Sequence, residues 1–271
     1  IQLKEIDLKN KIKDKLINSL NNLSKKFKNL YFFDLDKVMS TKGFENCFSN
    51  RNYYLMKCRL SDFGLKTLSE KIYKIVNTIS RPAKKVLILD CDNTLWGGVL
   101  SEDGMQKIQI GQDGIGSAFT HFQKVVKYLK NKGILIAIAS KNNQKDVLNV
   151  FKNHKSMILK DKDIISYKVN WEDKSKNIID LSNELMLGLD SFVFWDDNPI
   201  EREKVKKKLK TVEVIDPRED IAEWPQQLIE YSGFVKFNNT KDDVKKTQQY
   251  KLRNEFLEKK KLFNNEIYYL K

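Results

Sequence analysis

The chain has 271 residues, of which 41% are hydrophobic, and 50 Lys and Arg against 36 Asp and Glu give a formal net charge of +14. This is enough for a sizeable core in one large domain or two smaller ones. The sequence has no apolar run long enough for a bilayer span and no secretory signal, and its three cysteines form no CxxC pair, which argues against a disulfide framework or a zinc knuckle. We therefore expect a cytoplasmic protein.

Residues 1–80 combine helix and strand signals. Positions 6–30 have Ile and Leu at helical spacing, and Leu30–Phe33 predicts a short strand. A helix is expected after Ser61-Asp62, and Ser80-Arg81-Pro82 marks a domain boundary. We expect a smaller α/β segment here, without a catalytic constellation of its own, because it contains no His for a Ser-His-Asp triad.

From Lys84 onward, strands and helices alternate, which predicts a doubly wound parallel sheet in a catalytic domain over residues 81–240. The expected strands are Val86–Asp90, Ile134–Ala139, a weak one at Met157–Leu159, Ser191–Trp195 and Thr211–Ile215. Residues 96–116 are rich in glycine and predict a β-hairpin flap, with no large cap domain. Residues 241–271 are polar and basic and predict a C-terminal helix or linker.

The first predicted strand ends on two acidic residues. Side chains alternate along an extended chain, so Asp90 and Asp92 point to the same side and Cys91 to the other. Two carboxylates at a buried strand end repel each other and cost free energy to desolvate, and a divalent cation would offset that cost. The alternative is a solvated strand-to-loop junction in which Asp92-Asn93 only forms a turn.

Other predicted strands are also followed by polar residues: Ser140, Lys174, Asp196 and Asp197. Parallel strands place their carboxyl ends at one edge of a sheet, so these groups can converge with Asp90 and Asp92. Such a set supports the cleavage of a phosphoryl or acyl-phosphate group. One carboxylate would attack phosphorus, a second would act as acid and base, and Mg²⁺ would hold the phosphate. Ser140 can hydrogen-bond a phosphate oxygen, and Lys174 can balance its charge.

These motifs resemble those of the haloacid dehalogenase (HAD) superfamily. Asp90-Cys91-Asp92-Asn93-Thr94 matches its DxDxT signature, and Ser140, Lys174 and Asp196-Asp197 match its other motifs in order. More narrowly, the chain from about residue 84 to 255 is similar to the FkbH-like proteins of HAD subfamily IIIC. The matching segments are 92–99, Ser140-Lys141-Asn142, Asn170-Trp171 with Lys174, Asp196–Pro199 and Glu201-Arg202-Glu203.

The resemblance implies a role for each matching residue. Asp90 would be the nucleophile and a metal ligand, and Asp92 would be the acid and base, with its backbone carbonyl on the metal. Thr94 would steady the Asp92 loop. The phosphate or substrate contacts would come from Ser140, Lys141, Asn142 and Lys174. Asp197 would be a direct metal ligand, with Asp196 behind it.

Three residues of the flap allow two interpretations. Trp96, Gly97 and Gly98 either contact the substrate or only shape the flap. The cysteines bear on a further question, whether an enzyme thiol carries an intermediate. Cys91 should face away from the site, and residue 139, often Cys in relatives, is Ala139.

The resemblance also implies an activity. FkbH-like relatives remove phosphate from 1,3-bisphosphoglycerate and load the glyceryl unit onto an acyl carrier protein. A net charge of +14 suits such an acidic partner. The alternative is a HAD phosphatase for a small sugar phosphate or other metabolite in polysaccharide or secondary-metabolite biosynthesis. Residues 1–80 resemble the end of an SGNH-hydrolase-like domain, without catalytic function.

Two other classes of protein fit the sequence less well. A receiver module would carry its acid pair near the start and its acceptor aspartate later, the reverse of the order found here. Nucleic-acid binding is disfavoured because the lysine clusters, such as 206–208 and 259–261, are not interleaved with stacking aromatics.

Overall fold

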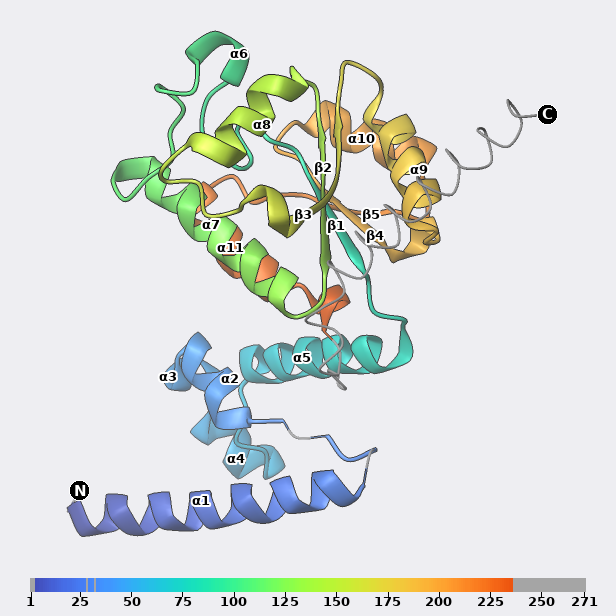
Figure 1. The fold of residues 1–271 in the computed structure, drawn as a ribbon. Helices are drawn as coiled ribbons and strands as arrows, with labels where there is room; N and C mark the ends of the chain where they lie inside the picture. Colours follow the sequence, from blue (N-terminus) through green and yellow to red (C-terminus); the bar gives the residue numbers. More distant parts are fainter. Residues whose placement is uncertain (1–2, 28, 32, 236–271) are drawn as a thin grey trace. The chain divides into compact units, whose positions relative to one another are not determined.

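The protein consists of two compact units, Ile1–Lys74 (unit 1) and Ile75–Lys271 (unit 2) (Figure 1). The computed structural model describes residues 3–27, 29–31 and 33–235. Among these residues, no helix has both the length and the apolarity needed to cross a bilayer. The predicted C-terminal helix or linker at residues 241–271 lies outside the described residues.

The described part of unit 1 is helical. Its helices are α1 (Leu3–Lys26), α2 (Leu35–Lys42), α3 (Phe44–Cys47), α4 (Asn50–Met56) and most of α5 (Asp62–Ser80). The prediction of an α/β segment over residues 1–80 is therefore wrong for the described residues, which form no strand there. The described residues of unit 1 offer Leu30 and Tyr31 no strand to pair with, and a lone strand is not stable. Asp34, at the end of the expected strand, instead caps α2 by accepting a hydrogen bond from Lys37 N at 3.0 Å.

Unit 2 is built on a five-stranded parallel sheet in the order β3-β2-β1-β4-β5 (Figure 1). The strands are β1 (Val86–Leu89), β2 (Leu135–Ser140), β3 (Ile164–Val169), β4 (Phe192–Trp195) and β5 (Glu213–Ile215). They are joined through α6 (Leu100–Asp103), α7 (Gly114–Asn131), α8 (Gln144–Asn153), α9 (Lys174–Leu185) and α10 (Pro199–Lys208), and α11 (Trp224–Ile229) follows β5. Four short 3₁₀ helices complete the described part: Asp161–Asp163, Leu189–Ser191, Ile221–Glu223 and Ser232–Phe234.

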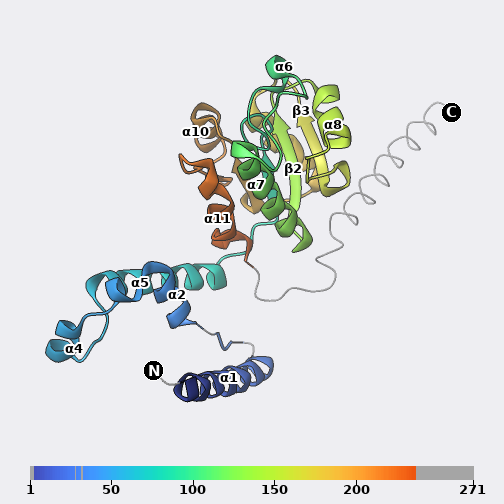
Figure 2. The ribbon, with the colours of Figure 1, turned by 90° about the vertical axis from the view of Figure 1, so that its left-hand side faces the viewer.

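Helices cover both faces of this sheet, as Figures 1 and 2 show. On one face, Leu87 and Leu89 of β1 pack in a core with residues of α7, α8 and α11. On the other, Val86 and Ile88 pack with residues of α9 and α10. This alternation along β1 explains why its four residues are all buried and all apolar. The prediction of a doubly wound parallel sheet is confirmed.

The predicted β-hairpin flap is different in the structure. Between Trp96 and Gly116 the chain forms the short helix α6, and only one antiparallel bridge, Gly97 to Gln109, remains of the hairpin. The side chain of Asp103 accepts a hydrogen bond from Val99 N at 2.8 Å and closes a helical turn. Gly98 and Gly104 have φ angles of +95° and +71°, which extended strands do not allow.

The third strand lies at a different place from the one predicted. Met157–Leu159 forms no strand, and β3 is Ile164–Val169. The buried side chain of Gln123 takes the place of a strand partner, because its Oε1 accepts hydrogen bonds from Ile158 N at 2.9 Å and Leu159 N at 3.1 Å. The backbone of this segment is satisfied without a sheet.

Asp163 links α7 to the start of β3. Its buried carboxylate accepts a hydrogen bond from Lys160 N at 3.0 Å and lies 3.4 Å from Lys127 Nζ and 3.3 Å from Lys130 Nζ. Burial alone would raise the pKa of Asp163, but these partners outweigh it and hold the pKa below its ordinary value. The charged form is thus the one that stabilises the fold.

We expect Asp163→Asn to lower the free energy of unfolding by about 1–3 kcal/mol at neutral pH, the usual contribution of hydrogen bonds to a charged group. The loss should shrink as the pH falls below about 4, because the wild-type carboxylate is protonated there too. Urea unfolding at several pH values measures it. Glu172→Gln, which breaks only the exposed pair with Lys176, is the control. Equal effects of the two variants would contradict the expectation.

Candidate active site

The candidate site lies at the carboxyl ends of β1 and β4, which are neighbours in the sheet. Leu89 pairs with Trp195, and Asp90 N donates to Trp195 O at 3.1 Å, so the pairing continues one residue past β1. Asp90 therefore lies beside Asp196. This register arises because both strands are short apolar runs that end at acidic residues.

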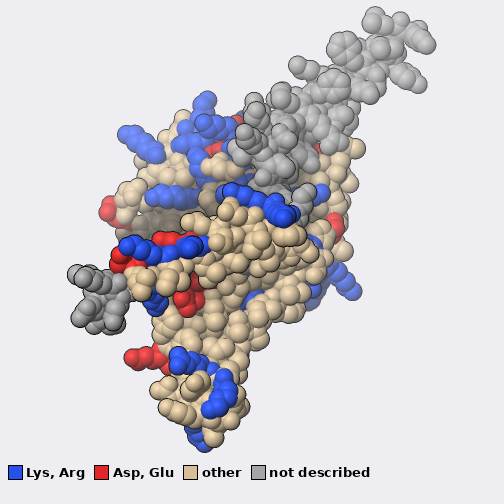
Figure 3. All heavy atoms as spheres, turned by 90° about the horizontal axis from the view of Figure 1, so that it is seen from below, with Lys and Arg blue, Asp and Glu red and all other residues tan. Residues whose placement is uncertain are grey.

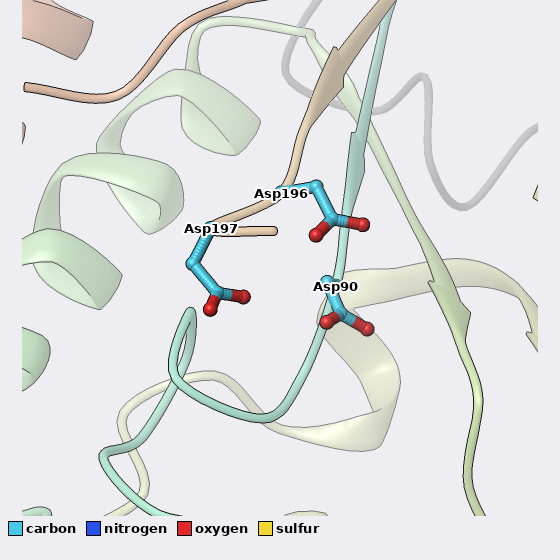
Figure 4. Close-up of side chains that lie close together, drawn as sticks. All are labelled: Asp90, Asp196 and Asp197. Carbon is cyan, nitrogen blue, oxygen red and sulfur yellow. The ribbon is translucent and has the colours of Figure 1, made fainter. Parts of the chain in front are cut away.

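Three carboxylates meet at this edge. One oxygen atom from each of Asp90, Asp196 and Asp197 lies within 4.8 Å of the others, and Figure 4 shows the three side chains around one space. Asp90 is 7% exposed and Asp196 is 0% exposed. Three carboxylates this close together, with little access to solvent, need cations to balance their negative charge.

Lys174 supplies one positive charge from inside the protein. It is the first residue of α9, which Asp173 caps by accepting a hydrogen bond from Ser175 N at 2.8 Å. Its Nζ lies 2.5 Å from Asp196 Oδ2 and 3.0 Å from Asp90 Oδ1, and the side chain is 3% exposed. Burial by itself would lower the pKa of Lys174, but the charges of Asp90 and Asp196 outweigh it and raise the pKa. Lys174 is a permanent cation at this site.

One ammonium does not balance three carboxylates. Burial, together with the charge of Asp90, raises the pKa of Asp196 to about 6, although Lys174 acts in the opposite direction. Burial and the charge of Asp90 also raise the pKa of Asp197. The cluster thus has unfavourable negative charge that a bound cation would relieve.

The two aspartates after β4 are held differently. Both carboxylate oxygens of Asp196 are engaged, one by Lys174 and the other by Asn198 N at 2.9 Å. Asp197 is partly exposed, and its Oδ1 accepts a hydrogen bond from the Thr94 hydroxyl at 3.3 Å. Thr94 therefore bridges the loop after β1 to the loop after β4.

Asp92 is held by donors from three places. Its Oδ1 accepts hydrogen bonds from Trp96 Nε1 at 2.9 Å and Leu100 N at 3.1 Å, and its Oδ2 accepts one from Asn142 Nδ2 at 2.8 Å. Burial raises the pKa of Asp92, and these bonds act against that rise. Asp92 faces the same edge of the sheet but is not one of the three clustered carboxylates.

Other sequence-predicted residues have different surroundings. Ser140, at the end of β2, is buried, and its side chain hydrogen-bonds the buried thiol of Cys91, whose pKa burial raises. Lys141 forms an ion pair with Glu201 Oε1 at 3.1 Å. Cys91 belongs to the core on the face of α7 and α8, as strand alternation predicts.

The flap residues shape the loop. Trp96 is 0% exposed, and so its ring faces the core. A Cβ at Gly97 would clash with Phe119 and Gln109, and Gly98 has a φ of +95° that favours glycine. These observations favour the structural interpretation of the three residues over direct contact with a substrate.

Arg202 was not predicted as a site residue. Its Nη1 donates to the backbone oxygens of Asp196 at 2.9 Å and Asp197 at 2.7 Å, and its Nε donates to Asp216 at 3.0 Å. Arg202 thus fixes the loop that carries both aspartates. Arg202 lies in the first turns of α10, the helix that follows the acidic pair. This position is the sequence signal that could have identified it.

Two of the solved structures that resemble this chain are described as a phosphatase domain and a HAD domain. The chain is 38% identical to the N-terminal part of the protein BF1531 from Bacteroides fragilis, described as containing a phosphatase domain complexed with Mg, with a TM-score of 0.72 over 80% of this chain and 58% of that chain. The HAD domain of the effector protein Lem4 from Legionella pneumophila is 17% identical over 60% of this chain and 98% of that chain, and its TM-score of 0.39 adds nothing to the assignment. Neither a protein-family model nor a curated protein matches.

The 38% identity to the BF1531 fragment, which is described as containing a phosphatase domain, is the finding that bears on this chain. The fold is HAD Rossmann-like, with a parallel five-stranded sheet between helices. The comparisons do not extend to the FkbH-like subfamily. The chain covers only 58% of the BF1531 fragment.

Proposed function

We propose that this protein is a Mg²⁺-dependent HAD-type phosphohydrolase with Asp90 as its nucleophile. The observation that carries the proposal is the cluster of three carboxylates and Lys174 at the ends of β1 and β4. The resemblance to a phosphatase domain that was crystallised with Mg supports it.

The donor set suits Mg²⁺, which prefers carboxylate and carbonyl oxygens. Asp90 Oδ1 is buried, and no donor among the described residues is aligned with it for a hydrogen bond, although Lys174 Nζ lies at salt-bridge distance. Both carboxylate oxygens of Asp196 accept hydrogen bonds, one from Lys174 and one from Asn198 N. The Thr94 hydroxyl donates to only one oxygen of Asp197. We assign Asp90, Asp197 and the backbone carbonyl of Asp92 as ligands. Asp196 would anchor Lys174 behind them.

When bound, the cation would neutralise the carboxylates and the charge of the phosphate. Asp90 would attack phosphorus and form an aspartyl-phosphate. Asp92 would protonate the leaving oxygen and later take a proton from water. Lys174 carries three N–H donors and two carboxylate partners, so a third donor can serve a phosphate oxygen. Ser140 would lie beside the phosphate at the end of β2.

For the substrate, we propose 1,3-bisphosphoglycerate. Asp90 would take the phosphoryl group of its 3-phosphate ester, and the acyl phosphate that remains would acylate the thiol of an acyl carrier protein, with phosphate as the leaving group. The flap is short, with the four-residue helix α6, which leaves room for a protein partner. The net charge of +14 favours an acidic one. On the face drawn in Figure 3, Lys and Arg side chains stand in several separate groups, with Asp and Glu beside some of them.

The cysteines favour a second candidate, a phosphatase for a sugar phosphate or other small metabolite. Cys91 is the only cysteine after residue 58, and it is buried with a raised pKa. A thiol in that state is a poor nucleophile. An intermediate thioester on this residue is therefore not supported, and a transferase would have to pass the glyceryl group directly to the carrier thiol.

One experiment distinguishes the two candidate functions, glyceryl transferase and metabolite phosphatase. With 1,3-bisphosphoglycerate and Mg²⁺, the transferase predicts phosphate release together with a glyceryl adduct on the carrier protein, seen by intact-mass spectrometry. Phosphate release without an adduct on any cognate carrier would favour the metabolite phosphatase.

Removing divalent cations should abolish phosphate release, because the carboxylates then lack the charge that lets an anionic phosphate approach. We expect EDTA to reduce the rate to background and excess Mg²⁺ to restore it, as measured by phosphate release from 4-nitrophenyl phosphate. Circular dichroism in EDTA controls for unfolding. Undiminished turnover by a folded, metal-free protein would rule out the proposed metal dependence.

A further inference from the structure

We infer that Trp96 and Asn142 are positioning residues that orient the carboxylate of Asp92, and that Asp92 Oδ2 is the oxygen that gives its proton to the leaving group. The inference deepens the proposed function and rests on it. Neither residue needs to touch the substrate for this role. It follows from the hydrogen bonds around Asp92 and from the burial of their donors.

Asp92 Oδ1 is the anchored oxygen. Trp96 Nε1 and Leu100 N both donate to it, at 2.9 Å and 3.1 Å, and a carboxylate oxygen has two lone pairs to offer. The indole of Trp96 is 0% exposed and stands edge-on to Phe151, with ring centroids 6.4 Å apart. A ring packed in this way cannot turn away from Asp92, so its N–H acts as a fixed donor.

Asp92 Oδ2 has a lone pair left for chemistry. Asn142 Nδ2 is its donor, at 2.8 Å. The amide of Asn142 is itself oriented, because its Oδ1 accepts a hydrogen bond from Asn143 N at 3.2 Å and its nitrogen must then face Asp92. Asn142 is 3% exposed. One bond on Oδ2 against two on Oδ1 leaves Oδ2 as the oxygen that can carry a proton.

The step that uses this proton is the first phosphoryl transfer. A bond forms between an Asp90 oxygen and phosphorus, while the bond from phosphorus to the leaving oxygen breaks and its electron pair stays on that oxygen. The proton on Asp92 Oδ2 passes to the leaving oxygen. An alkoxide is strongly basic and needs this proton, whereas a carboxylate leaving from an acyl phosphate does not.

Substrates with different leaving groups therefore reveal a misplaced Asp92. We expect Trp96→Phe to lower kcat/KM for glycerol 2-phosphate about 10- to 100-fold, the usual cost of losing a supporting hydrogen bond around a catalytic group. For acetyl phosphate, kcat/KM should be nearly unchanged, because its leaving group departs without a proton. The value of kcat/KM reports the first phosphoryl transfer and does not depend on the later hydrolysis of the aspartyl-phosphate.

Trp195→Phe is the matched control. Trp195 is also 0% exposed, but its Nε1 has no hydrogen-bond partner among the described residues. The same loss of ring atoms should therefore leave the ratio of the two kcat/KM values at its wild-type level. Should Trp96→Phe fail to fold, Asn142→Ala removes the donor on Oδ2 and should show the same selective loss with the alkyl phosphate.

The possible failures are distinguishable. An equal fall for both substrates in Trp96→Phe, or in Asn142→Ala if that variant is needed, would mean a general structural defect and overturn the positioning role. The same selective loss in Trp195→Phe would also overturn it. A wild-type protein that releases phosphate from neither substrate with Mg²⁺ would instead overturn the proposed function.

Discussion

Asp90→Asn is expected to abolish phosphate release, with residual turnover at the limit of detection. The amide oxygen is a poor nucleophile toward phosphorus, and the variant also loses a charge that Lys174 and the cation need. The change keeps the volume of the side chain at a 7% exposed position, so folding should be preserved. Phosphate release with Mg²⁺ and 4-nitrophenyl phosphate measures the loss.

A covalent test adds to the rate measurement. Acid quenching of the wild-type protein during turnover should trap an aspartyl-phosphate, visible as a mass increase that Asp90→Asn lacks. Asp146→Asn, an exposed position in the first turn of α8, is the control and should keep wild-type turnover. Turnover by Asp90→Asn equal to that of the control would exclude Asp90 as the nucleophile.

The second large effect is expected for Lys174→Met. The variant leaves the buried carboxylates of Asp90 and Asp196 without their ammonium partner, and breaking a buried ion pair from one side costs about 3–5 kcal/mol. We therefore expect a fall of this size in the free energy of unfolding in EDTA, measured with urea. Phosphate release should be lost as well, because the donor for the phosphate oxygen is gone.

Mg²⁺ provides a further check on this variant. A bound cation restores positive charge beside Asp90, so added Mg²⁺ should stabilise Lys174→Met by raising its urea midpoint. Lys176→Met, two residues along the same helix, removes only an exposed pair with Glu172 and should change stability by less than about 0.5 kcal/mol. If Lys174→Met unfolds at the urea concentration of this control, Lys174 does not hold the cluster together.

Strand periodicity predicted the convergence of the acidic residues. Val86–Asp90 and Ser191–Trp195 are short apolar runs before acidic residues, and parallel pairing then places Asp90 next to Asp196. The third strand was misplaced because Met157–Leu159 is as apolar as a strand. Its backbone partner is the side chain of Gln123, which lies on a helix about 35 residues earlier. No local pattern contains that contact.

The prediction of a strand in the segment before the sheet was wrong for a related reason. Leu30–Phe33 has strand propensity, but propensity alone does not form a strand where the described residues of the same unit contain no second strand. In the flap, glycines were taken as hairpin turns, whereas two of them have positive φ around a helical turn that Asp103 closes. Both errors arise where one long-range or side-chain contact outweighs the local preference.

Taken by itself, the sequence determined the doubly wound sheet and the strand ends that carry its acidic residues, because alternation and apolar runs encode which face is buried. Only the tertiary structure decided what each oxygen contacts: Lys174 between Asp90 and Asp196, and Trp96 turned inward onto Asp92. Those pairings depend on desolvation and on side chains brought together from distant parts of the chain. Periodicity carries no information about either.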